Sequence, residues 1–155
     1  MISKIAGIKS YRVGKLIQQL GTIAQLLDTE LEHYQYKNEL LLTDFLLETA
    51  SLVDIKEFKD SRKDLFLVHS LIYDLSLPTS LSAIAYRAKE FSSGTLPLSV
   101  TERLNELCCR LFDNSFNEPP NIPLMQQDLS TIIQTIQWVD DTMANDWDHR
   151  DAVTS

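Results

Sequence analysis

The chain has 155 residues and a mass of 17.7 kDa, with 44% hydrophobic and 23% charged residues, which is typical of one globular domain over residues 1–155. A chain of this length buries about 70% of the surface of its unfolded form, so it can form a core without disulfides or metals. The net charge of −8 argues against nucleic acid as a partner, because such proteins replace counterions with clustered Lys and Arg.

The first predicted element is one long helix over residues 3–34. Its apolar residues recur at spacings of three and four and form a seam: Val13, Leu16, Leu20, Ile23 and Leu27. The pattern weakens at Glu30, where we expect a break that one further turn through Tyr34 could follow. Polar residues at 35–38 predict the first turn. Residues 39–58 are apolar on nearly every face, which is typical of a helix at the centre of a bundle.

Capping residues predict the next helices. Ser61, followed three residues later by Asp64, would open a helix that ends before Pro78, since the residue before a proline is disfavoured in helical geometry. Thr79 or Ser80 is then expected to cap a short helix from Leu81 through Phe91, which residues 92–94 would end.

The second half of the chain adds two further helices. Ser99 and Glu102 fit a capping box ahead of an apolar helix over 104–112. A proline-rich loop over 113–123 then precedes an acidic C-terminal helix over 124–150. Because no segment alternates in the manner of a strand, the predicted fold is an all-α, single-domain antiparallel bundle of about five to six helices.

Small residues follow one side of the first predicted helix and form a ridge away from its apolar seam. This small-residue ridge consists of Ser3, Gly7, Ser10, Gly14, Ile17, Gly21 and Ala24. A glycine costs about 1 kcal/mol in a helix interior, so a close approach of another helix would explain three of them. We therefore predict an interface with a second copy or a partner protein. The alternatives are a helix buried on both sides within its own domain and a poorly formed first helix.

The same segment is basic, because Lys4, Lys9, Arg12 and Lys15 precede its first acid at Asp28. A basic amphipathic N-terminus could lie on an anionic membrane surface or act as a targeting sequence, although its glycines argue against a strong amphipathic helix. No run of 18 apolar residues is present, so we expect no transmembrane segment.

Acidic residues are concentrated after Gly94, where three Lys or Arg stand against ten Asp or Glu. Asp140, Asp141 and Asp148 are the predicted contacts for a basic protein partner. A solvated acidic face is the alternative. A cation site that includes His149 is a third reading, but the segment lacks the glycine turn of a calcium loop.

The two cysteines, Cys108 and Cys109, are adjacent within a helical pattern and are predicted to be buried free thiols. Free thiols indicate a reducing compartment, and we expect a cytoplasmic protein. His69 lies in an apolar helix and is interpreted as a core histidine rather than a ligand. The join between the short helices is too long for a helix-turn-helix.

No metalloprotease, nucleophile-elbow or phosphate-loop motif occurs, so we assign no catalytic residue, cofactor or metal ligand. The predicted function is non-enzymatic protein binding through helix surfaces by a regulator, adaptor, chaperone or immunity-type protein, with a homodimer as one form of association. The alternative is a metal-dependent helical hydrolase that uses carboxylates from Glu48–Asp64 or Asp140–Asp151. The first cluster is interleaved with Lys and Arg, which is typical of an exposed, salt-bridged face.

Overall fold

The computed structural model describes residues 2–37, 39–41, 61–117 and 120–154 of the chain. Side chains are described for residues 11–37, 39–41, 65–117 and 120–144. Within the described residues, the chain forms helices and no strand, as the sequence predicts. The helices are α1 (Ile2–Lys37), α3 (Ser61–Tyr73), α4 (Leu81–Ser92), α5 (Leu98–Asn114) and α6 (Ile122–Thr154).

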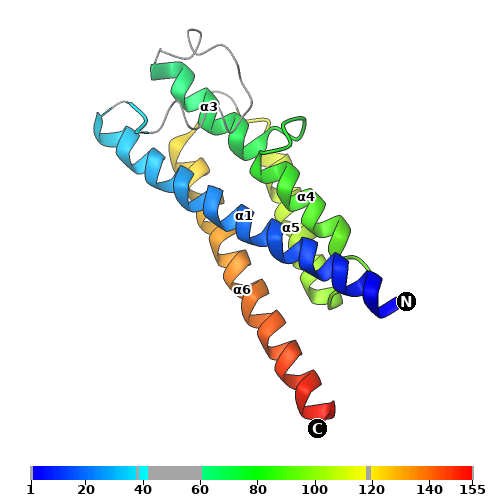
Figure 1. Cartoon of the computed structure of the whole chain (residues 1–155). Coiled ribbons are helices and arrows are strands. Elements are labelled where there is room, and N and C mark those ends of the chain that lie inside the picture. The colour runs from blue at the N-terminus through cyan, green and yellow to red at the C-terminus, as the bar shows by residue number, and fades with distance from the viewer. Residues whose placement is uncertain (1, 38, 42–60, 118–119, 155) are drawn as a thin grey trace.

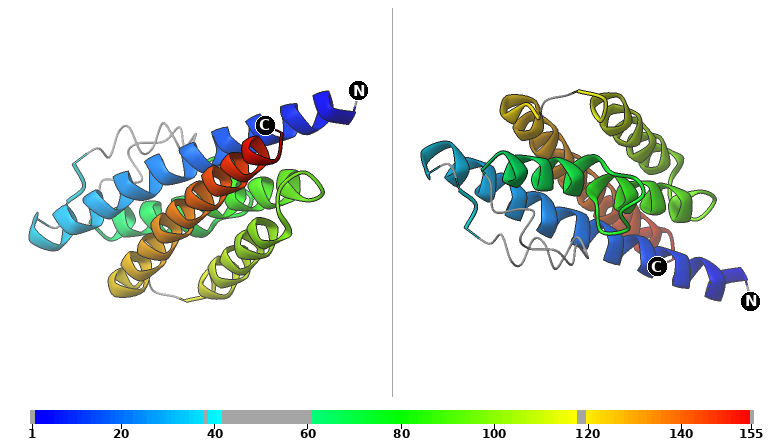
Figure 2. Two further views of the ribbon diagram at one scale, coloured as in Figure 1. Left: turned by 90° about the horizontal axis from the view of Figure 1, so that it is seen from below. Right: turned by 90° about the horizontal axis from the view of Figure 1, so that it is seen from above.

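Four of these helices contact one another in a closed ring, in which α1 packs on α4 and α6 while α5 joins α4 to α6 (Figure 1). The helix α3 leads into α4 along nearly the same direction and contacts both α4 and α5. Seen from above, α3 and α4 lie between α1 and α5 (Figure 2). The prediction of an all-α bundle is therefore confirmed.

The core follows the apolar seam of α1. Leu20, Leu27 and Leu31 are fully buried in a cluster with residues of α3 to α6, whereas Val13 and Ile17 belong to a smaller cluster nearer the N-terminal end of α1. Each cluster receives residues from helices on both sides of α1. The helix α1 thus packs against both α4 and α6. The segment 39–58, expected at the centre of the bundle, lies almost wholly outside the described residues.

The predicted break near Glu30 is wrong, because α1 continues without interruption to Lys37. The Glu30 side chain is 1% exposed, and its Oε2 accepts a hydrogen bond of 2.7 Å from the backbone N–H of Leu41. A polar residue that weakens the apolar pattern therefore anchors the chain that follows the helix. The predicted turn at 35–38 is correspondingly too early.

The turn between α3 and α4 begins earlier than its proline indicates. Helix α3 ends at Tyr73, and Asp74 then accepts hydrogen bonds from the backbone N–H and the hydroxyl of Ser76, at 3.0 and 2.6 Å. Such an Asx turn competes with the helix for the backbone donors. Ser80 caps α4 as predicted, since its hydroxyl oxygen accepts from the N–H of Ala83 at 3.1 Å.

The capping box at Ser99 is wrong. Helix α5 begins at Leu98 behind Pro97, so Ser99 already lies within its first turn and no side chain caps the helix. A proline at the start of a helix sacrifices no helical hydrogen bond, because the N–H groups of the first turn have no acceptor within the helix. Its ring also fixes φ near the helical value, so proline favours helix initiation. Gly94 ends the preceding turn with a φ of +79°, the left-handed conformation that favours glycine.

The loop between the last two helices is shorter than the predicted 113–123. Helix α5 includes Asn114, and α6 begins at Ile122, where the Asn121 side-chain oxygen accepts from the N–H of Leu124 at 3.1 Å. Helix α6 also continues to Thr154, beyond the predicted end at 150. None of the described helices combines the length and the hydrophobicity that crossing a membrane requires.

Candidate protein-binding groove

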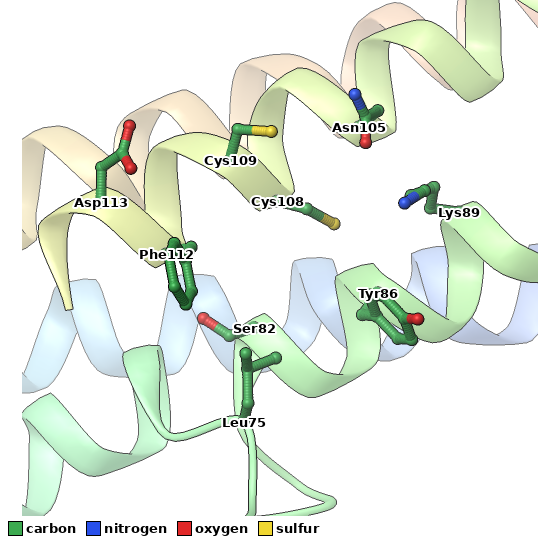
Figure 3. Close-up of a pocket in the computed structure, with 9 residues that line it drawn as sticks. All are labelled: Leu75, Ser82, Tyr86, Lys89, Asn105, Cys108, Cys109, Phe112 and Asp113. Atoms are coloured by element: carbon green, nitrogen blue, oxygen red, sulfur yellow. The ribbon is translucent and has the colours of Figure 1, made fainter.

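A largely apolar groove of about 260 Å³ lies on the surface between α4 and α5 (Figure 3). We call it the α4–α5 groove. It is lined by Leu75, Ser82, Tyr86, Lys89, Asn105, Cys108, Cys109, Phe112 and Asp113. Apart from the two cysteines, the sequence does not mark these residues as functional, because the groove depends on how two helices pack rather than on a motif.

Small side chains explain why the two helices leave a groove between them. Ser82 and Cys108 project from facing helices into it (Figure 3). The hydroxyl of Ser82 donates to the backbone oxygen of Ile72 at 2.8 Å, which satisfies its polarity within the fold. Both α4 and α5 also carry fully buried core residues, such as Ile84 and Leu104, so the lining side chains stand on helices that are anchored in the core.

Large apolar side chains remain exposed around the groove. Leu75 is 49% exposed, Tyr86 48% and Phe112 51%. One helical turn beyond, Phe116 is 70% exposed, and its ring meets that of Phe112 edge to face at a centroid distance of 5.2 Å. A second hollow, of about 330 Å³, adjoins the groove and shares Leu75 and Phe112 with it. Leu75 and Phe112 therefore connect the groove with the hollow at the end of α3.

The charged residues at the groove are unevenly balanced. The Lys89 ammonium lies 3.7 Å from a carboxylate oxygen of Glu90 and 5.2 Å from the centre of the Tyr86 ring. Asp113 lines the groove at the Phe112 end, and Asp74 lines the adjoining hollow; both acids are exposed. The single cation of the lining is thus already paired, and the end near Phe112 is acidic.

The two thiols differ in environment, so the prediction that both are buried is wrong for one of them. Cys108 is partly buried, whereas Cys109 is exposed, and both are free. Burial raises the pKa of the Cys108 thiol to about 11, although the nearby Lys89 acts in the opposite direction. A thiol with such a pKa is protonated near neutral pH and therefore a poor nucleophile.

A buried polar cluster, which sequence reasoning missed, holds the helices behind the groove. The fully buried carboxylate of Asp128 on α6 accepts from Tyr73 Oη at 2.5 Å, from Arg110 Nε at 2.8 Å and from Asn114 Nδ2 at 2.9 and 3.0 Å. Burial, and then the bond to Asp128, raises the pKa of Tyr73 far above its ordinary value. A recognisable signal existed, because Asp128 shares the apolar face of Met125, Leu129 and Ile132.

His69 contributes to the hollow beside the groove rather than to the interior of the core. It is partly buried, lines that hollow, and stacks on Tyr73 with ring centroids 4.7 Å apart and the planes tilted by 53°. The interpretation as a core histidine is therefore too simple. The residue packs against a member of the Asp128 cluster.

The small-residue ridge divides into buried and exposed positions. Ile17 and Ala24 are buried within this chain, and a Cβ at Gly21 would lie 3.4 Å from Ile136 of α6. Ile17 and Ala24 therefore pack inside the chain, whereas Gly21 is only partly buried. Gly14 is exposed with no atom within 4 Å of an added Cβ, whereas Ser3, Gly7 and Ser10 lie where side chains are not described.

The predicted acidic contacts lie on α6. Asp140 and Asp141 are exposed. Partial desolvation of the Asp140 carboxyl, and then the neighbouring charge of Asp141, raises the pKa of Asp140. The side chain of Asp148 falls outside the described residues, as do those of the Glu48–Asp64 cluster. Among the described residues, no group of three His, Cys, Asp or Glu side chains has the arrangement of a metal site.

Comparisons of the chain with protein-family models, with curated proteins and with solved structures find no match.

Proposed function

We propose that this chain is a non-enzymatic protein-binding bundle that acts through the α4–α5 groove. The observation that carries the proposal is the set of large apolar side chains at the groove, Leu75, Tyr86 and Phe112, together with Phe116, each about half exposed or more. Exposed apolar side chains that surround a hollow are a common mark of a protein interface, and aromatic residues are enriched among binding hot spots.

The energy available from this surface supports the proposal. Covering the exposed half of one aromatic side chain removes roughly 100 Å² from water, which stabilises a complex by about 2–3 kcal/mol before the costs of association. Tyr86 and Phe112 stand on facing helices and could hold one occupant from both sides (Figure 3). Because both helices are anchored in the core, little ordering would be needed on this side of the interface.

A regulator, adaptor, chaperone or immunity-type protein would use such a surface, and the exposed Gly14 leaves a homodimer through α1 as a separate proposal. The free thiols of Cys108 and Cys109 support a reducing, cytoplasmic location. Neither role requires a cofactor.

Affinity capture from the native host tests the function, with the intact chain as bait at low and then high salt. A double variant, Tyr86→Ala with Phe112→Ala, removes the apolar side chains of the groove. Tyr36→Ala is the matched control, because Tyr36 is an 80% exposed aromatic residue on α1. We expect proteins that the wild type and the control retain and that the double variant loses. Identical sets from all three baits would refute the role of the groove.

A separate measurement addresses the alternative of a metal-dependent hydrolase. Mg²⁺ or Mn²⁺ is expected to leave the melting temperature of the chain unchanged. A rise of several degrees that disappears on Asp140→Asn with Asp141→Asn, or on Glu48→Gln, would favour the enzyme instead, since a ligand that binds only the folded state stabilises it.

A further inference from the structure

We infer that the occupant of the α4–α5 groove is a cationic amphipathic helix of a partner protein, with its apolar face in the groove and basic side chains beside Asp74 and Asp113. This inference rests on the proposed function and specifies the class of partner. It draws on the length of the groove, the position of its aromatic residues and the distribution of charge around it.

The length of the groove fits two turns of a helix. Its lining residues on α4 run from Ser82 to Lys89, and those on α5 run from Asn105 to Asp113. At 1.5 Å per residue, these segments extend about 10–12 Å. A docked helix presents apolar anchors at positions i, i+3 or i+4, and i+7 over the same distance.

The apolar anchors of the groove stand on both of its walls. Tyr86 extends from α4, and Phe112 extends from α5 toward Leu75 and Ser82 (Figure 3). A strand would need backbone partners, and the walls of the groove are helices whose backbone groups are bonded internally. A helix satisfies its own backbone and therefore needs only an apolar face.

The charge around the groove selects a basic partner. Asp113 and Asp74 are exposed at its Phe112 end, where neither forms an ion pair with another described residue. The cations of α5 lie toward α6 instead. Arg110 is bound to Asp128, and the guanidinium of Arg103 lies 5.1 Å from the centre of the Trp138 ring.

Glu106 lines a separate hollow between α5 and α6, together with Arg103 and Arg110, so the acids at the groove itself are Asp113 and Asp74. Lys89, at the other end, is paired with Glu90. Complementary charges guide encounter and fix the register of a complex more than they add affinity. A helix with basic residues beside its apolar face would meet Asp113 and Asp74 at the Phe112 end of the groove.

The test selects binders from a displayed library of random 18-residue peptides against the intact chain. The expected binders have apolar residues at helical spacing and a net positive charge. Synthetic copies should protect Cys109, which is exposed in the groove, from alkylation by iodoacetamide. Fluorescence anisotropy then measures their affinity for a set of variants.

The variants separate the apolar from the electrostatic contribution. Tyr86→Ala and Phe112→Ala should each weaken binding about tenfold, whereas Tyr36→Ala should leave it unchanged. Asp74→Asn with Asp113→Asn should weaken it about threefold or more and flatten its salt dependence. Asp141→Asn, at an exposed acid on α6, is the matched charge control. Thermal unfolding confirms that each variant is folded, as expected for exposed positions.

The possible outcomes distinguish the proposed class of partner from the proposed function, which is protein binding through the α4–α5 groove. Two results would contradict the cationic helix but still support the groove as a binding site. In the first, the peptides that protect Cys109 are acidic or extended. In the second, their affinity does not change in the Asp74 and Asp113 variants. A failure to select any peptide that depends on Tyr86 or Phe112 would overturn both. If the chain self-associates in sedimentation and Phe112→Ala abolishes this association, the occupant is a second copy of the chain, which contradicts a helix from a partner protein.

Discussion

The hydroxyl of Tyr73 donates a hydrogen bond of 2.5 Å to Oδ2 of Asp128, which ties the end of α3 to α6 across 55 residues of sequence. The other carboxylate oxygen receives Arg110 Nε, and Asn114 reaches both, so one fully buried acid joins three helices. Each donor fits a lone pair of the same carboxylate. The position of α5, and with it one wall of the groove, therefore depends on this cluster.

Replacing Asp128 with Ala should lower the free energy of unfolding by about 3–5 kcal/mol, because the donors around it lose their acceptor in the interior. Tyr73→Phe, which removes one donor, should cost about 1.5–3 kcal/mol. Urea unfolding followed by circular dichroism measures both. Asp113→Ala, at an exposed acid, should change stability by less than about 0.5 kcal/mol. Equal effects of the two Asp→Ala changes would contradict the role of the cluster.

Replacing Gly94 or Gly14 with alanine should change the stability of the fold in opposite directions. Gly94 has a φ of +79°, so a Cβ there is strained, and Gly94→Ala should destabilise by about 1 kcal/mol. Gly14 lies within α1 with open space around an added Cβ, so Gly14→Ala should stabilise by about 0.5–1 kcal/mol. Thermal melts of the two variants compare them directly. A stabilised Gly94→Ala protein would show that this turn is not left-handed in solution.

The two candidate capping serines should also differ. Ser80→Ala removes the acceptor for the N–H of Ala83 and should cost about 1 kcal/mol. Ser99→Ala should be nearly neutral, because Ser99 lies inside α5 and caps nothing. Denaturant midpoints at constant m-value provide the measurement. If Ser99→Ala were the costlier change, the capping box would exist after all.

Alkaline conditions should destabilise the fold through Cys108 and Tyr73. The Cys108 thiol has an ordinary pKa of 9.0 and a pKa of about 11 in the fold. Between these values the unfolded chain releases its proton while the folded chain retains it, so stability decreases as pH rises. Tyr73 acts in the same direction at higher pH, because its pKa is also raised.

Urea unfolding of the reduced protein at pH 8, 9, 10 and 11 measures this decrease. Cys108→Ala should flatten the curve between pH 9 and 11, whereas Cys109→Ala, at an exposed thiol, is the control. An unchanged slope in the Cys108 variant would assign the alkaline sensitivity to other groups.

The helices were largely predictable because their apolar residues repeat at helical spacing and because proline, glycine and serine mark several ends. The seam of α1 through Val13, Leu20 and Leu27 is buried as its spacing indicates. The errors are polar residues whose role depends on distant partners. The local pattern at Glu30 predicts a break, because it does not reveal that the Glu30 carboxylate accepts a hydrogen bond from the N–H of Leu41.

The groove could not be predicted from the sequence. Its walls come from α4 and α5, and the exposure of Phe112 is decided by which face of α5 the core leaves open. The ridge of small residues can be seen in the sequence, but Ile17 and Ala24 are buried within the same chain, and a Cβ at Gly21 would lie 3.4 Å from Ile136 of α6. Spacing identifies a contact face and does not identify its partner.

The contact between α1 and α6 closes the ring of helices with segments from opposite ends of the sequence. Val13 and Ile17 complete their cluster only with Val139, more than 100 residues later. Such distant contacts are expected to form late in folding, because closing a long loop costs conformational entropy before the free energy of the new contacts can compensate for it. During synthesis, part of the apolar face of α1 would therefore remain exposed to water until most of α6 has emerged from the ribosome.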